Sequence, residues 1–361
     1  MRIGIVGAGQ LGRMMALSGI PLGLQFTMYD QSRDVAGAAV APIVTGRFDD
    51  LARLALFAES VDVVTFDWEN VPVAAARAIA KCVPVWPPPR ALEVSQDRWS
   101  EKQLFRRLGI PHAPTAQVDS RGDLQRAIAE LGTPGILKTR RLGYDGKGQA
   151  RLRRASDAGR AWRRLQGQPL VYEQFVPFTR ELSLIGARDR AGRTAFYPLA
   201  ENRHDHGILA ETRAPYRDAG LQRKAERHHR RLMQSLGYVG VLCIEYFMLR
   251  GRLVANEIAP RVHNSGHWTI EGAETSQFEN HVRAVAGLPL GPTRPRGHAV
   301  MFNLIGRLPP SSSLLALPGV HLHAYGKSPR PGRKLGHVTR ISATPAERDR
   351  AAATLRRRIG H

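Results

Sequence analysis

A basic segment rich in glycine is the first part of the chain whose residue types could do chemistry. The apolar residues Ile136 and Leu137 precede Lys138, and residues 139–149 then carry three closely spaced glycines and a second lysine, Lys147. Glycine lets the backbone approach a ligand closely, and successive N–H groups in such a loop can bind an anion. The spacing of a Walker loop is absent. The segment therefore predicts a polyphosphate site, with a basic surface hairpin as the alternative.

Two acidic residues lie in neighbouring apolar runs that we expect to be strands. Glu245 lies in the run 239–248 and Glu257 in the run 253–258, and a turn at Arg250 and Gly251 would pair the two runs antiparallel. Two carboxylates brought together in this way repel each other unless a cation or a base lies between them. Oxygen ligands favour Mg²⁺, and Asn256 adds a neutral carbonyl. The alternative is a pair of edge-strand acids that face the solvent.

The residues that follow Glu257 suggest an oxyanion site. Arg261 offers a planar fork for bicarbonate or phosphate, and His263, Asn264 and Ser265 offer further polar contacts. His263 and His267 lack a third ligand at a zinc-like spacing, so we do not expect a zinc site.

Residues 7–12 form the pattern G-x-G-x-x-G. The apolar run 3–6 comes before it, a predicted helix to residue 19 and a predicted strand at 25–29 come after it, and Asp30 follows. This spacing matches the dinucleotide fingerprint and predicts a helix N-terminus directed at an anion. A nicotinamide-dependent oxidoreductase is one alternative function.

The elements that must position these residues indicate an α/β and α+β protein of three domains. Strands alternate with helices over 1–95, which predicts a parallel sheet, and the prolines at 87–89 mark its end. Residues 96–290 mix helices with antiparallel strands, and 291–361 are rich in strands. The expected strands include 62–66, 83–86, 149–152, 170–175, 181–187, 194–199, 298–305, 320–325 and 335–341. The expected helices include 71–81, 97–109, 121–131, 219–236 and 345–358, with a loop at 309–318.

Composition limits the other classes of function. The formal net charge of +22 comes mainly from arginines spread along the chain, without an aromatic-interleaved RNA module or a zinc finger. We therefore expect no nucleic-acid partner, and a salt-dependent gel shift tests that alternative. Two cysteines make no disulfide framework, which favours the cytoplasm. We read no signal peptide and no run of apolar residues long enough for a membrane span.

Taken together, these motifs resemble the ATP-grasp superfamily and, within it, the family of ATP-dependent 5-(carboxyamino)imidazole ribonucleotide synthetases. The segments that carry the resemblance are 9–14, 143–149, 259–268 and 330–337. The resemblance implies an ATP-grasp architecture. It consists of a Rossmann-like N-terminal domain (1–95), a central ATP-grasp domain (96–290) with a lid at about 115–175, and a small C-terminal domain rich in β-structure (291–361).

The resemblance also implies a reaction. ATP would phosphorylate bicarbonate to carboxyphosphate, and the exocyclic amine of 5-aminoimidazole ribonucleotide would then be carboxylated, with Mg²⁺ present and ADP and phosphate released. The glycine segment would close as a lid that excludes water. The resemblance suggests a homodimer. Another ATP-grasp ligase, such as a formate-using transformylase, is the alternative within the superfamily.

The resemblance further implies a role for individual residues. For ATP it implies Arg98, Lys138, Gly143, Tyr144, Asp145, Gly146, Lys147, Gly148, Gln149, Glu173, Gln174, Phe175, Val176, Glu181, His204, Asn256 and Glu257. For the ribonucleotide it implies Gln10, Leu11, Glu69, Tyr144, Asp145, Lys327, Arg333 and Lys334. The metal ligands would be Glu245 and Glu257. The catalytic residues would be Arg261, Lys138, Asp145, His263 and Asn264.

Two positions depart from the family pattern. Leu142 stands where the family commonly has glycine, which bears on the closing motion of the lid. Asp67 replaces one of a pair of glutamates, which bears on its contact with the substrate.

Overall fold

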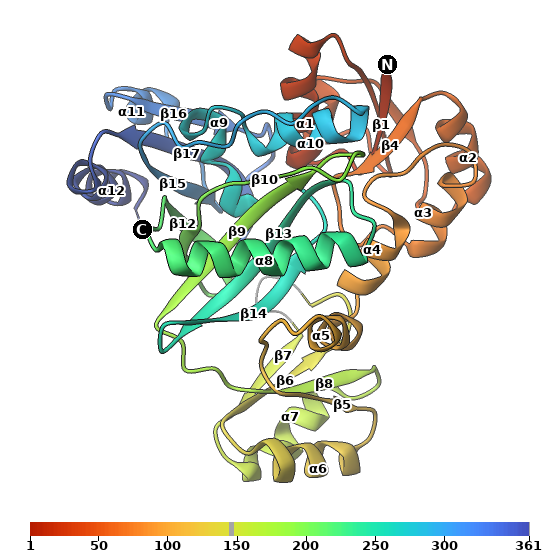
Figure 1. Cartoon of the computed structure of the whole chain (residues 1–361), viewed down its shortest axis with the longest axis vertical. Helices are drawn as coiled ribbons and strands as arrows, with labels where there is room; N and C mark the ends of the chain where they lie inside the picture. Colours follow the sequence, from red (N-terminus) through yellow and green to blue (C-terminus); the bar gives the residue numbers. More distant parts are fainter. Residues whose placement is uncertain (144–147, 361) are drawn as a thin grey trace.

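The chain builds three β-sheets in the computed structural model, which describes residues 1–143 and 148–360 (Figure 1). One sheet lies near the N-terminus, a second runs through the centre, and a third projects at one end of the molecule. No helix among the described residues is long and apolar enough to cross a membrane.

The N-terminal sheet has four parallel strands in the order β3-β2-β1-β4. Their bounds are β1 (Arg2–Val6), β2 (Gln25–Asp30), β3 (Ile43–Thr45) and β4 (Val63–Phe66). Helices α1 (Gln10–Gly19), α2 (Leu51–Glu59) and α3 (Val73–Ile79) lie around it (Figure 1). Because the sheet is covered on both faces, β4 and most of β1 are buried and read as continuous apolar runs. The predicted parallel α/β sheet is confirmed.

The predicted strand at 83–86 is wrong. Only a single bridge forms there, between Val64 and Val85. Proline has no N–H to donate to a ladder, and Pro84 and Pro87 flank the bridge. The prolines that follow do not lead into a loop but start helix α4 (Pro89–Ser95), since proline is well tolerated in the first turn of a helix.

The central sheet has nine strands, in the order β14-β13-β9-β11-β12-β15-β17-β16, with β10 paired to β9. Its first members are β9 (Arg180–Arg188), β10 (Thr194–Phe196), β11 (Ala200–Asp205), β12 (Ile208–Ala214), β13 (Gly240–Leu249) and β14 (Arg252–Ala259). The predicted β13–β14 hairpin is confirmed, and it places Glu245 directly opposite Glu257.

Two helices cover opposite faces of this part of the sheet. Leu182 and Leu184 of β9 pack in the cluster that includes α8 (Ala219–Ser235), whereas Ile185 and Ala187 pack in the cluster that includes α10 (Gln277–Ala286). Because side chains alternate along a strand, Glu245 points to the face opposite α8.

The strands of residues 291–361 continue the same sheet. They are β15 (His298–Ile305), β16 (Val320–Ala324) and β17 (Lys334–Ser342), and β15 pairs with β12. Helix α12 (Pro345–Ile359) contacts β15 and β17. The predicted loop at 309–318 contains a short helix, α11 (Ser311–Leu315).

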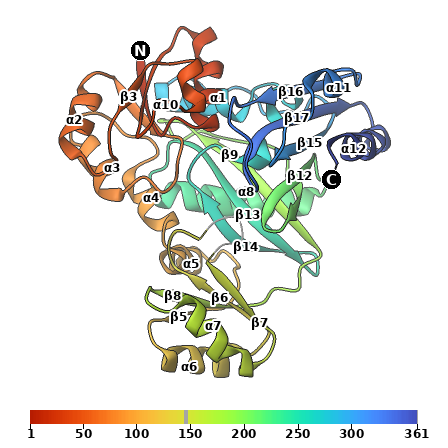
Figure 2. The same ribbon diagram turned by 180° about the vertical axis from the view of Figure 1, so that it is seen from behind.

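The third sheet is antiparallel and projects away from the rest with two helices on its outer side (Figure 2). Its strands are β5 (Thr115–Val118), β6 (Gly135–Thr139), β7 (Gln149–Leu152) and β8 (Leu170–Gln174), and its helices are α6 (Arg121–Leu131) and α7 (Ala158–Leu165). Helix α5 (Arg98–Arg107) lies between this sheet and β14, with contacts to both β5 and β14. The remaining short elements are η1 (Ile20–Leu22), η2 (Ala36–Ala39), η3 (Ala155–Asp157), η4 (Asn264–Gly266) and α9 (Thr269–Gly272).

Candidate functional site

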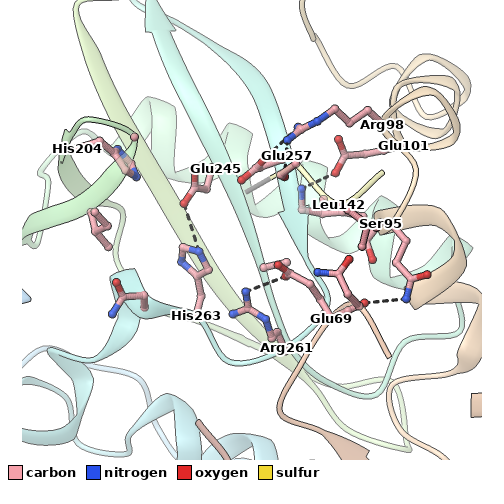
Figure 3. Close-up of a pocket in the computed structure, with 18 of the residues that line it drawn as sticks. Glu69, Ser95, Arg98, Glu101, Leu142, His204, Glu245, Glu257, Arg261 and His263 are labelled. Atoms are coloured by element: carbon pink, nitrogen blue, oxygen red, sulfur yellow. Dashed lines mark hydrogen bonds and ion pairs between the residues drawn. The ribbon is translucent and has the colours of Figure 1, made fainter. Parts of the chain in front are cut away.

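A cleft with an open volume of about 1020 Å³ lies where the three sheets approach one another (Figure 3). The residues predicted for the site that line it are Glu69, Arg98, Gly143, His204, Glu245, Glu257, Arg261, His263, Asn264 and Lys334. They come from the N-terminal part, the start of α5, the segment after β6 and the central sheet. The fold therefore brings together segments that are far apart in the sequence.

The opposed acids of the hairpin form one wall of this cleft. Burial, together with the nearby charge of Glu257, raises the pKa of Glu245 to about 7. Burial would also raise the pKa of Glu257, but the guanidinium of Arg98, whose Nη1 lies 3.1 Å from Glu257 Oε2, lowers it. Such a divergence is expected when two carboxylates share one site and a guanidinium lies beside only one of them.

Arg98 links this wall to the base of the glycine segment. Its Nη2 donates to the carbonyl oxygen of Gly143 at 2.9 Å, and its backbone N–H donates to the carbonyl of Arg140. The residue before it, Asp97, caps α5 by accepting from the N–H groups of Trp99 and Ser100. Asp97 also pairs with Arg140 at 2.8 Å. The start of α5 therefore holds the end of β6.

A buried charge network lies behind these residues. Lys138 Nζ contacts Glu173 Oε2 at 2.5 Å, and Lys102 Nζ lies 3.0 Å from Glu101 and 3.9 Å from Glu173. Lys102 also donates to the carbonyl oxygen of Asn256. Burial would raise the pKa of Glu173, but the charges of Lys138 and Lys102 lower it to about 2. Glu173 is thus held as a carboxylate between two lysines.

Lys102 is not among the residues predicted for the site from the sequence. Its side chain is only 2% exposed, which is rare for lysine. A signal was available, because Arg98, Glu101 and Lys102 have the i, i+3, i+4 spacing that places residues on one face of a helix.

Other residues predicted for ATP lie around or beyond the cleft. His204 Nδ1 lies 3.0 Å from Glu181 Oε2, so these two side chains contact each other. Gln174, Phe175 and Val176 lie at or just after the end of β8 and do not line the cleft; the amide of Gln174 donates to Leu131. Gly148 accepts a hydrogen bond from Thr139 N, and Gln149 begins β7. Tyr144, Asp145, Gly146 and Lys147 lie outside the described residues.

A second cleft, with a smaller open volume of about 760 Å³, lies beside the N-terminal loop. It is lined by Gly7, Ala8, Gly9, Gln10, Leu11, Asp30, Phe48, Asp67, Trp68 and Arg261. Arg261 therefore borders both clefts, and its Nη2 lies 2.8 Å from Glu69 Oε2. Lys327 donates to the side chain of Gln10, whereas Arg333 lies at the surface and donates to the carbonyl of Ser328.

Acidic side chains already occupy part of the N-terminal loop. Asp30 Oδ2 accepts from the N–H of Ala8 at 2.8 Å. A Cβ added at Gly9 would lie only 2.7 Å from Asp67 Oδ2, so the buried Asp67 needs glycine at that position. Asp30, the acid of the dinucleotide fingerprint, thus bonds to the loop itself.

Leu142 has a backbone conformation that favours glycine. Its φ is 60° and its side chain is exposed. A left-handed conformation costs a non-glycine residue roughly 1–2 kcal/mol, so this departure from the family pattern falls where glycine would relieve strain.

The donor set of the larger cleft fits Mg²⁺. Among residues 1–143 and 148–360, no group of three His, Cys, Asp or Glu side chains could hold a metal ion by itself. Mg²⁺ is commonly bound by one or two carboxylates together with phosphate oxygens of a substrate. Glu245 and Glu257 supply two carboxylates that lie opposite each other on one wall of the cleft.

The fold and the site are those of an ATP-grasp protein. A pair of acids lies on a central hairpin, a small antiparallel sheet carries a buried lysine on β6, and a parallel sheet lies at the N-terminus. Family models agree: residues 103–278 match the ATP-grasp domain, 1–96 the ribonucleotide synthetase preATP-grasp domain, and 299–351 the phosphoribosylaminoimidazole carboxylase C-terminal domain.

Similarity to whole proteins identifies the family within the ATP-grasp proteins. The N5-carboxyaminoimidazole ribonucleotide synthase of Pseudomonas aeruginosa is 50% identical over 339 residues, which cover 94% of each chain. The crystal structure of the corresponding synthetase from Thermus thermophilus has a TM-score of 0.96 at 50% identity and covers 99% of each chain. The Aspergillus clavatus enzyme, solved with ADP and 5-aminoimidazole ribonucleotide, has a TM-score of 0.92 at 29% identity, with 100% of this chain and 99% of that chain covered. The chain belongs to the N5-carboxyaminoimidazole ribonucleotide synthase family.

The buried network gives a stability prediction. We expect Glu173→Gln to lower the free energy of unfolding by about 3–5 kcal/mol, because it leaves two buried lysines without their shared counter-charge. Adding Lys138→Met to this variant should restore part of the loss, because it removes the buried lysine that pairs with Glu173. Denaturant unfolding of both variants measures this. As a control, Asp49→Asn breaks an exposed pair with Arg47 and should change stability little; an equally small effect of Glu173→Gln would contradict the network.

Proposed function

We propose that the protein carboxylates the exocyclic amine of 5-aminoimidazole ribonucleotide at the expense of ATP and bicarbonate, and releases ADP and phosphate. One observation carries the proposal: Arg261 borders both the larger cleft with its acidic wall and the smaller cleft at the N-terminal loop. An oxyanion at Arg261 would lie between a nucleotide in one cleft and a ribonucleotide in the other. The names of the relatives support the same reaction.

In this proposal the larger cleft takes ATP. Arg98 and Lys138 face its phosphates together with the glycine segment, and Glu181 and His204 lie on the nucleoside side. Bound Mg²⁺, held by Glu245 and Glu257, would neutralise charge on the phosphates. Phosphoryl transfer depends mainly on positioning and charge neutralisation, and Arg98 contributes to both because Glu257 and Gly143 fix its guanidinium.

The carboxylation follows in two steps. A bicarbonate oxygen attacks the γ-phosphorus of ATP, the bond to the bridging oxygen of ADP breaks, and carboxyphosphate forms. The amine nitrogen then attacks the carboxyl carbon, and phosphate leaves with the electron pair of the broken C–O bond. Arg261 would hold the carboxylate oxygens with its planar fork, while His263 and Asn264 border the same space.

The ribonucleotide would occupy the smaller cleft. Gln10 and Leu11 lie at the start of α1, where backbone N–H groups favour a phosphate. Lys327 contacts Gln10, and Glu69 holds Arg261 in place. Arg333 and Lys334 add positive charge nearby. We further propose a homodimer, on the family resemblance, and a location in the cytoplasm, on the two free cysteines.

The metal site gives the first functional prediction. Glu257→Gln should reduce ADP formation about a hundredfold or more, since charge neutralisation by the metal supplies several kcal/mol to the transition state. A coupled assay for ADP, with and without bicarbonate and the ribonucleotide, measures it, and circular dichroism checks the fold. Glu59→Gln, at an exposed position, is the control. Turnover like that of the wild type in Glu257→Gln would remove the metal site.

The same assay separates two ligases. We expect ADP release to require both bicarbonate and 5-aminoimidazole ribonucleotide. Release that requires formate in place of bicarbonate would instead indicate a transformylase.

The smaller cleft gives a prediction of its own. Lys327→Ala should raise the KM for the ribonucleotide about tenfold or more, because a charge-assisted hydrogen bond is lost, and should raise the KM for ATP much less. Steady-state kinetics with each substrate varied in turn measures this. Lys224→Ala, on the exposed side of α8, is the control. An unchanged KM for the ribonucleotide would argue against a phosphate contact.

A further inference from the structure

A chain of hydrogen bonds runs from His263 into the central sheet. His263 Nδ1 lies 2.8 Å from the hydroxyl of Ser265, which lies 2.8 Å from the hydroxyl of Ser183. The amide of Asn202 lies 2.9 Å from Ser183 Oγ, and Thr212 ends the chain at Asn202 Oδ1. The four residues behind His263 are all at most 6% exposed. None of them touches the cleft, so the steps described above leave the chain unexplained.

The direction of these hydrogen bonds is set at the His263 end. The backbone N–H of Ser265 points at His263 Nδ1 at 3.3 Å, and a backbone N–H can only donate, so Nδ1 must accept. The hydroxyl of Ser265 therefore donates to Nδ1 and accepts from Ser183. Ser183 in turn accepts from the NH₂ group of Asn202, which leaves Asn202 Oδ1 to accept from Thr212. All members of the chain agree on one arrangement.

The other ring nitrogen of His263 faces the acidic wall. Nε2 lies 3.3 Å from Glu245 Oε1, and Figure 3 shows the ring directed at that carboxylate. The main chain of His263 is held as well, because the side-chain amide of Gln277 bonds both to its N–H and to its carbonyl oxygen. The ring is therefore fixed in position and in orientation.

We infer that Ser265, Ser183 and Asn202 are positioning residues that hold His263 in the tautomer with the proton on Nε2, so that it acts as a hydrogen-bond donor into the cleft. Its part in the reaction rests on the proposed function; the tautomer itself does not. A ring that carries its proton on Nε2 and accepts at Nδ1 cannot take up the amine proton at Nε2. It can donate a hydrogen bond to a carboxylate or phosphate oxygen, where negative charge develops. The amine proton then leaves with the departing phosphate, which is released as a base.

The tautomer can be measured directly in the resting protein. Long-range ¹H–¹⁵N correlation spectra of protein labelled in histidine distinguish a protonated ring nitrogen from a bare one, and His263→Gln assigns the signal. We expect a bare Nδ1 and a protonated Nε2 in the wild type. Ser183→Ala and Ser265→Ala should broaden the signals of the ring nitrogens or give a mixture of the two tautomers. Asn202→Asp should favour a proton on Nδ1, because it replaces the NH₂ donor with an acceptor. A proton on Nδ1 in the wild type would overturn the inference.

Kinetics provide the second measurement. We expect Ser183→Ala and Ser265→Ala to lower kcat roughly tenfold or more, as is usual when a hydrogen bond behind a functional histidine is lost, and to leave the KM for ATP within about twofold. Thr212→Val is the matched control: it removes a buried hydroxyl from the same chain but keeps the NH₂ group of Asn202, so tautomer and kcat should stay near wild type. Variants with a changed tautomer and a wild-type kcat would show that the donor role is wrong.

The two failures can be told apart. If the wild type shows the expected tautomer but makes no carboxylated ribonucleotide, the proposed function fails and the assignment of the proton stands. If it makes the product with a proton on Nδ1, the proposed function stands and this inference fails. Because Ser265 lies at the short helix η4, Ser183→Ala keeps the test valid if Ser265→Ala does not fold.

Discussion

The structure depends on two carboxylates that share one hairpin. The register of β13 and β14 sets Glu245 opposite Glu257. Two like charges on directly opposed residues are unfavourable unless positive charge compensates them. Arg98 supplies this charge to Glu257 from α5. His263, from the segment after the hairpin, reaches Glu245 as a neutral hydrogen-bond donor. The cleft beside the two acids would accommodate a cation and the anionic substrate that would accompany it.

Charged residues of α5 also connect the small antiparallel sheet of β5–β8 to the central sheet. Lys102, on α5, contacts Glu173 of the lid sheet and the main chain of Asn256 in β14. Asp97, at the start of that helix, binds Arg140 after β6. Helix α5 thus joins the residues that would hold phosphate to the residues that would hold metal. Its ion pairs have little access to water, so salt screens them weakly.

Much of this arrangement could be predicted from the sequence because its signals are local. The β13–β14 hairpin followed from two apolar runs around a turn with glycine, and Arg261 from its position just after the second acid. The strand predicted at 83–86 was wrong because Pro84 and Pro87 have no N–H group to donate to a neighbouring strand, although the segment is apolar. Ser183 and Asn202 could not be found in the same way, since each acts through a partner on another strand or segment. The strands β11 and β12, rich in charged residues, gave no clear alternation and were likewise not predicted.

A crystal structure with Mg²⁺, a non-hydrolysable ATP analogue and 5-aminoimidazole ribonucleotide would show whether the two acids and Arg261 serve one site. We expect a metal ion bound by oxygens of both Glu245 and Glu257 and by the phosphates, with the ribonucleotide beside Gln10 and with Arg261 between the two ligands. A nucleotide bound outside this cleft, or a metal ion that touches neither acid, would contradict this expectation.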